Sequence, residues 1–173
     1  MEFFIGKIFE GEYPPEAAVW CNAGGEAYIK EIEPQNGVRR SGIVAVPAPT
    51  LDELKAQKHD ALNVAHMQAE ETAHVVSSLG FEIDANARAN RDIAGLLLTI
   101  EEGKTVKFCD YRNVMRDVTR ADLETMQIEI VKNAQSLYSQ KWLYRSQIDN
   151  AKSSTALSNL SFTFRYESFY KGK

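Results

Sequence analysis

The stretch that decides the fold is residues 119–151, TRADLETMQIEIVKNAQSLYSQKWLYRSQIDNA. It contains no proline or glycine, and Thr119 supplies an N-terminal cap with Asp122 in the first turn. Apolar or aromatic residues recur at steps of seven, with two apolar residues at intervening positions: Leu123, Ile130, Leu137, Tyr144 and Ala151, with Ala134 and Ile148. This spacing predicts one long helix whose seam packs against another helix.

A second helical pattern precedes that stretch. Thr50 and Glu53 have capping-box spacing, and no glycine or proline follows before Gly80, so we expect a helix over residues 51–79. Its stripe comprises Leu51, Leu54, Ala61, Leu62, Ala65, Ala69, Ala73 and Val76. Because isolated helices are marginally stable in water, we expect the two long helices to pack antiparallel.

Residues 80–98, GFEIDANARANRDIAGLLL, connect the two helical patterns. Their charges, among them Arg91 and Asp92, could form a ligand site, but each residue also has a structural role. We expect Asp84 to cap a short helix over residues 85–101 and Arg88 to pair back to Asp84. Residues 104–110 and 113–119 then predict a β-hairpin.

The two ends of the chain have different patterns. Residues 1–49 predict a small β-α-β-β unit: strands over 3–10, 26–33 and 38–46, a helix over 16–22, and an Asn36-Gly37 turn. Residues 158–173 alternate aromatic and polar side chains, which predicts a half-buried strand packed on the N-terminal sheet or on another chain. The predicted fold class is therefore α+β, with domains at 1–49, 50–152 and 153–173.

Composition excludes several classes of protein. The 173 residues carry a formal net charge of −4, which gives no broad electrostatic case for nucleic-acid binding. Trp142 and Tyr144, with Lys141 and Arg145, could stack on bases, but their helical spacing favours core aromatics beside extended cations. The two cysteines indicate neither a disulfide framework nor a zinc site, and no apolar run is long enough for a membrane. We expect a soluble protein made in a reducing cytosol.

The one candidate metal set is His66, Glu70 and His74, spaced four residues apart on the predicted helix. A single straight helix separates the two histidines by about 12 Å, so the alternative is a polar stripe beside the core. No nucleophile elbow, phosphate loop or dinucleotide fingerprint is present in the sequence. The sequence therefore predicts no catalytic residues and no cofactor.

Four segments in this order resemble a domain of unknown function that recurs in bacteriophage tail-fibre and other tail-associated proteins. They are LDELKAQKHDALN (51–63), GFEIDANARANRDIAGLL (80–97), VKFCDYRNVMRDVT (106–119) and the helix at 119–151. The leader at 6–49, GKIFEGEYPPEAAVWCNAGGEAYIKEIEPQNGVRRSGIVAVPAP, resembles segments that precede this domain in phage and prophage tail proteins. The resemblance implies a virion or assembly role and carries over no catalytic residues.

We therefore expect a structural or adaptor subunit of a phage tail, at the fibre, tail tip or baseplate. It would be made in the host cytoplasm, reside in the virion tail, and form homo- or hetero-oligomers with other tail proteins. The alternative is a tail-fibre assembly chaperone, and a third, less favoured hypothesis is a metal-dependent enzyme at His66, Glu70 and His74. The expected partner-binding residues are the aromatic C-terminal set Leu160, Phe162, Phe164, Tyr166, Phe169 and Tyr170.

Overall fold

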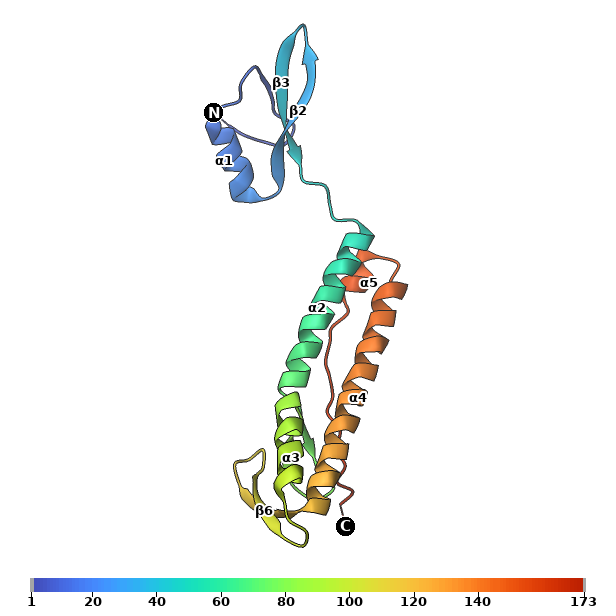
Figure 1. The fold of residues 1–173 in the computed structure, drawn as a ribbon. Helices are drawn as coiled ribbons and strands as arrows, with labels where there is room; N and C mark the ends of the chain where they lie inside the picture. The colour runs from blue at the N-terminus through green and yellow to red at the C-terminus, as the bar shows by residue number, and fades with distance from the viewer. Residues whose placement is uncertain (1, 173) are drawn as a thin grey trace. The chain divides into compact units, whose positions relative to one another are not determined.

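The computed structural model describes residues 2–172 and divides into two compact units, Met1–Pro49 and Thr50–Lys173 (Figure 1). Its fold class is α+β, as the sequence predicted. The division falls at the proline-containing linker, and residues 153–173, which we had set apart as a separate tail, belong to the second unit. Within residues 2–172, no helix combines the length and apolar character needed to cross a membrane.

The first unit is a three-stranded antiparallel sheet with one helix. Its elements are β1 (Ile8–Glu10), α1 (Pro15–Gly24), β2 (Ala27–Gln35) and β3 (Val38–Ala45), with β3 in the centre of the sheet. Asn36 and Gly37 both have positive φ, 51° and 78°, which confirms the predicted Asn-Gly hairpin turn. The predicted β-α-β-β order is confirmed, although β1 is shorter than expected.

The helix α1 covers one face of this sheet. Ala17 and Cys21 of α1 are buried against Phe9, Ala27 and Ile43 of the strands. Cys21 is therefore a packed apolar residue. Along β2 and β3, the residues that alternate with this buried set lie on the opposite face.

Residues 50–172 of the second unit contain four helices and two β-hairpins. The helices are α2 (Leu51–Glu71), α3 (Ala87–Thr99), α4 (Arg120–Asn150) and α5 (Ser154–Ser158). One hairpin pairs β4 (His74–Val76) with β5 (Glu82–Asp84), and the other pairs β6 (Thr105–Cys109) with β7 (Met115–Thr119). Figure 1 shows α2 and α3 following one another along α4 and running antiparallel to it.

The helix α2 ends at Glu71, earlier than the predicted residue 79. Val76, the last residue of the predicted helical stripe, instead lies in β4, where Val75 pairs with Ile83 and the Val75 and Ile83 side chains are buried. Gly80 turns the chain with a φ of 88°. The hairpin lacks an Asn-Gly or Asp-Gly signal, and its short apolar run fits a helical period as well as a strand.

The capping of α3 also differs from the prediction. Asn86, and not Asp84, caps the helix by accepting a hydrogen bond from the backbone N–H of Ala89 at 2.9 Å. Asp84 belongs to β5, and Arg88 lies 3.8 Å from Asp92 instead of pairing back to Asp84. This exposed contact is worth little to stability.

The helix α4 is capped and packed largely as predicted. Thr119 and Asp122 form a reciprocal capping box, and Leu123, Ile130 and Leu137 are buried. Two corrections concern the seam: Ala134 is exposed, and Glu129 and Asn133 are buried in its place. The predicted seam is therefore correct at its large apolar positions and more polar than expected along one flank.

Candidate functional site

The C-terminal strap, residues 159–172, lies along α2 and α4. It is extended, but the only strand-like pairing described is an isolated bridge between Val76 and Ser168, so the predicted terminal β-strand is wrong. The sequence predicts packing on the N-terminal sheet or on another chain, whereas the contacts of the described residues are with the helices of the strap's own unit. The strap residues and the helix side chains that hold them form the candidate site.

Side chains of α4 satisfy the backbone of the strap. Gln140 donates to the carbonyl of Arg165 and accepts from its N–H, both at 2.8 Å. The Tyr144 hydroxyl donates to the carbonyl of Thr163 at 2.8 Å and accepts from its N–H at 3.2 Å. Asn133 accepts from the N–H of Glu167 at 2.9 Å. These side chains replace the neighbouring strand that an extended backbone usually requires.

The aromatic side chains of the strap alternate with these backbone contacts. Phe162 and Phe164 meet the ring of Tyr144 edge-on at 5.3 and 5.6 Å. Phe164 also approaches the His66 ring at 5.4 Å, and the Tyr166 hydroxyl bonds to Thr72 at 2.9 Å. The sequence therefore correctly predicted that the aromatic side chains of the strap are half-buried. They are buried because the strap packs against helices, and not because it belongs to a sheet.

Five of the six predicted partner-binding residues are half-buried against their own chain: Leu160, Phe162, Phe164, Tyr166 and Phe169. The sixth, Tyr170, is 50% exposed. Contact with another protein through these residues stays a prediction. The sequence analysis did not predict the α4 residues that hydrogen-bond to the strap. Their pattern could have indicated them, because a polar stripe at helical spacing lies beside the apolar seam: Asn133, Ser136, Gln140 and Tyr144.

The structure separates the candidate metal ligands. His66 Nδ1 lies 3.2 Å from a Glu70 carboxylate oxygen, but His74 is in β4, stacks on Tyr111 and contacts Glu82 at 3.5 Å. Among the described residues, no three His, Cys, Asp or Glu side chains are grouped so that they could hold a metal ion. The assignment of His74 to the helix was wrong because α2 ends before it.

His66 is nevertheless an unusual residue. Its side chain is buried under the strap, and its Nε2 atom has no hydrogen-bond partner. Burial lowers the pKa of the His66 ring below its ordinary value, Glu70 opposes this shift, and Lys141 adds to it. The folded second unit therefore favours the neutral form of the His66 ring over its protonated form.

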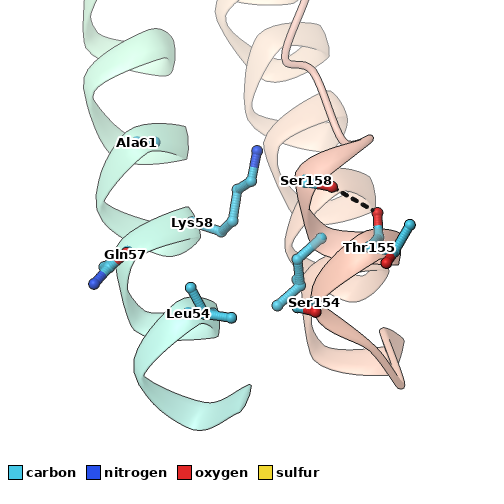
Figure 2. Close-up of a pocket in the computed structure, with 8 residues that line it drawn as sticks. Leu54, Gln57, Lys58, Ala61, Ser154, Thr155 and Ser158 are labelled. Carbon is cyan, nitrogen blue, oxygen red and sulfur yellow. Dashed lines mark hydrogen bonds between the residues drawn. The ribbon is translucent and has the colours of Figure 1, made fainter. Parts of the chain in front are cut away.

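A cavity of about 610 Å³ lies between α2 and α5 (Figure 2). Its lining residues are Leu54, Gln57, Lys58, Ala61, Ser154, Thr155, Leu157 and Ser158. Lys58 is the one charged residue among them, and its ammonium already donates to the Leu160 carbonyl at 2.8 Å. With no carboxylate or imidazole in the lining, these residues supply no general acid–base pair.

A second, smaller cavity of about 260 Å³ lies between the two hairpins and is lined by ion pairs. Asp110 is buried, pairs with Arg116 at 2.8 Å and accepts the N–H groups of Arg112 and Val114. The Val114 bond lowers the pKa of Asp110 below its ordinary value, burial opposes this, and Arg116 and Arg112 add to the lowering. Asp110 therefore holds the β6–β7 turn together, because its oxygens already have partners.

The outer face of α4 departs from the sequence prediction. Tyr144 packs inward as expected, but Trp142, which we had placed in the core, is 50% exposed. Arg145 lies over its ring at 5.3 Å. Large apolar side chains therefore remain uncovered on this helix.

Comparison with known proteins gives one match. No curated protein and no solved structure matches the chain. A family model described as a domain of unknown function (DUF4376) matches residues 53–162, which include most of α2, all of α3 and α4, both hairpins of the second unit and the first part of the strap. The chain therefore belongs to the DUF4376 family.

Proposed function

We propose that this protein is a structural or adaptor subunit of a bacteriophage tail that acts through protein–protein contacts. The sequence resemblance to tail-associated proteins supports the tail assignment. The observation that supports a contact role is the uncovered apolar surface of both units. Contiguous apolar surface on a folded protein is typical of an interaction site.

In the first unit, that surface is the sheet face opposite the one that contains Phe9 and Ile43. Ile8, Tyr28, Ile32 and Val44 share this face, and Ile8 and Tyr28 are 49% and 41% exposed. Lys30 and Arg40 lie among them. An antiparallel sheet commonly has one solvated face, but such a face is usually polar, so its apolar side chains favour a protein partner.

In the second unit, the strap packs along α2 and α4 and contacts two buried apolar clusters. Ile93, Leu123 and Leu137 belong to one buried cluster, and Leu62 and Ile148 belong to a second that the strap also contacts. A unit with a buried core of this kind suits a permanent structural subunit.

The experiment is mass spectrometry of purified virions from the phage that encodes this chain. We expect the chain at a fixed ratio to other tail proteins, and its absence from virions would refute the structural role. The test variant is Tyr28→Lys, which we expect to fold and to be incorporated less because it places charge on the open sheet face.

The second candidate is a tail-fibre assembly chaperone, which the uncovered apolar sheet face would also suit. Co-expression separates the two roles. If the fibre protein becomes soluble only with this chain present, and the chain is then absent from virions, the chaperone role is correct and the structural role is wrong.

A further inference from the structure

The strap covers a histidine that has no place for a second proton. His66 on α2 is 5% exposed, and the Phe164 ring of the strap meets the His66 ring edge-on with centroids 5.4 Å apart. Figure 1 shows the strap running between α2 and α4 in the second unit. We propose that the strap is a pH-sensitive lid, which stays closed over the neutral His66 ring and opens around Phe164 when that ring takes up a second proton.

The two ring nitrogens of His66 have different surroundings. Nδ1 lies 3.2 Å from a Glu70 carboxylate oxygen, which can accept a hydrogen bond only from an Nδ1–H group. The neutral ring therefore carries its proton on Nδ1 and a lone pair on Nε2. Nε2 is buried and has no hydrogen-bond partner among the described residues. A second proton would create a buried, charged N–H group without an acceptor, which is strongly unfavourable in a protein interior.

The charged side chains that the structure describes around His66 do not supply that acceptor. On α2, Glu70 lies on the Nδ1 side of the ring. On α4, Lys141 is a cation and disfavours a second positive charge. On the strap, Arg165 is exposed, and the Glu167 carboxylate already accepts a hydrogen bond from a serine hydroxyl of α4 at 2.6 Å. Protonation of Nε2 is therefore compatible only with a structure in which the ring reaches water.

The other two histidines differ, because each has a carboxylate beside its Nε2 atom. His74 Nε2 lies 3.5 Å from a Glu82 oxygen, and His59 Nε2 lies 2.8 Å from an Asp149 oxygen. A proton on either nitrogen meets a carboxylate without movement of the chain. His74 also contacts the strap, since its ring and that of Tyr166 meet edge-on with centroids 4.8 Å apart. His74 is therefore an internal control for His66.

The strap is the element around His66 that can move at the least cost. The helix α2 has 21 residues with internal backbone hydrogen bonds, and it packs on α4 through buried apolar residues. Near Phe164 the strap backbone is held by two side chains of α4: Tyr144 binds Thr163, and Gln140 binds Arg165. Local opening of such a segment requires less free energy than unfolding of a packed helix.

The ordinary pKa of histidine sets the largest possible effect. A solvated imidazole with a pKa of about 6.5 is about 90% protonated at about pH 5.5 and about 10% protonated at about pH 7.5. Burial lowers the pKa of His66 under the closed strap, Glu70 opposes this shift and Lys141 adds to it. The closed state therefore binds the proton more weakly than the open state, and acidification favours opening. Over this pH range the equilibrium constant for opening can rise by up to about tenfold.

Amide hydrogen exchange of the full chain, from about pH 7.5 to about pH 5.5, measures this opening. Each rate is divided by the intrinsic rate at the same pH, so that the protection factor reports opening alone. We expect the protection of the Thr163 and Arg165 amides to fall severalfold, up to about tenfold, while the Leu137 amide in the core of α4 keeps its protection. Unchanged protection of the strap amides, or an equal loss at Leu137, would overturn the inference.

Two variants separate His66 from the other titrating groups. His66→Phe keeps an aromatic ring under the strap and removes the titration, so we expect the protection of the strap amides to become independent of pH. The matched control is His74→Asn, which should retain the wild-type loss of protection. If His66→Phe still loses protection in acid, or if His74→Asn does not, His66 is not the group that opens the strap.

Nuclear magnetic resonance of the wild-type chain tests the same point without a substitution. At about pH 7.5 we expect the nitrogen chemical shifts of the His66 ring to show a proton on Nδ1 and a lone pair on Nε2. On acidification the ring should gain its second proton over the pH range in which the Arg165 amide loses protection. A neutral ring protonated on Nε2, or a fully protonated His66 beneath a strap that stays protected, would refute the inference.

This inference goes beyond the proposed tail function and does not depend on it. The two can fail separately. An acid-sensitive strap in a chain that is absent from virions would refute the tail role alone. A virion component whose strap protection is independent of pH would refute the lid alone.

Discussion

Gln140 offers the sharpest test of how the strap is held. Its amide pairs with both backbone groups of Arg165, at 2.8 Å each, and Gln140→Ala removes both hydrogen bonds. The neighbouring strap contacts, from Tyr144 to Thr163 and from Asn133 to Glu167, remain in the variant. The substitution therefore removes one contact between the strap and α4 and leaves the buried apolar clusters intact.

The expected magnitude follows from those two bonds. Each contributes about 0.5–1.5 kcal/mol net, and because Gln140 is half-buried, water replaces part of what is lost. We expect the free energy of unfolding of the second unit to fall by about 1–2 kcal/mol, which lowers its melting temperature by roughly 3–10 °C. Gln147→Ala is the matched control, because Gln147 is exposed on the same helix and gains the same helix propensity.

Urea denaturation and amide hydrogen exchange give the readouts. The Arg165 amide should exchange faster in Gln140→Ala, while the Glu167 amide keeps its acceptor in Asn133. If Gln140→Ala and Gln147→Ala have equal unfolding midpoints and Arg165 protection is unchanged, the proposed attachment of the strap is refuted.

Two further predictions concern the second unit. Thr119→Ala removes the cap of α4, because the Thr119 hydroxyl accepts a hydrogen bond from the Asp122 N–H at 3.2 Å. We expect this variant to lower the free energy of unfolding by about 1 kcal/mol, measured by urea titration. Ser139→Ala, on the exposed face of the same helix, should have little effect. Because the folded pKa of His66 lies below its ordinary 6.5, the unfolded chain takes up the proton first, so stability should fall as the pH drops below 6.5 towards the folded pKa. His66→Phe should flatten this dependence between about pH 7.5 and pH 5, measured by thermal denaturation at each pH, and an unchanged slope would exclude His66 as its source.

The sequence was sufficient for those elements whose signals are local. The capping residues Thr50 and Thr119 and the Asn36-Gly37 turn each act on the backbone within a few residues, so their effects are visible in a short window. The β4–β5 hairpin was missed because Ala73 and Val76 continue the helical stripe, although the short apolar run that contains Val76 also fits a strand. Pairing with Ile83, a contact between residues distant in sequence, decides between them.

The candidate site was predicted only in part. The alternation of Phe162, Phe164 and Tyr166 correctly indicated half-burial, but not what buries them. Gln140 and Asn133 looked like ordinary polar positions of a helix, because their role depends on an extended backbone that arrives from the end of the chain. The exposure of Trp142 was likewise invisible, since an aromatic residue at helical spacing usually lies in a core.

By itself, the sequence determined the α+β class, the division at the proline linker, and the inner seam of α4, because caps, turns and periodicity operate over a few residues. Only the tertiary structure decided that a second row of apolar residues, on the outer face of α4, stays uncovered. The inner seam meets α2 and α3, and the strap occupies the groove along its flank, leaving the outer one at Ile128, Val131, Tyr138 and Trp142 in solvent. Which side of α4 is covered depends on the surfaces that the rest of the chain brings against it, and the sequence of the helix alone does not specify this.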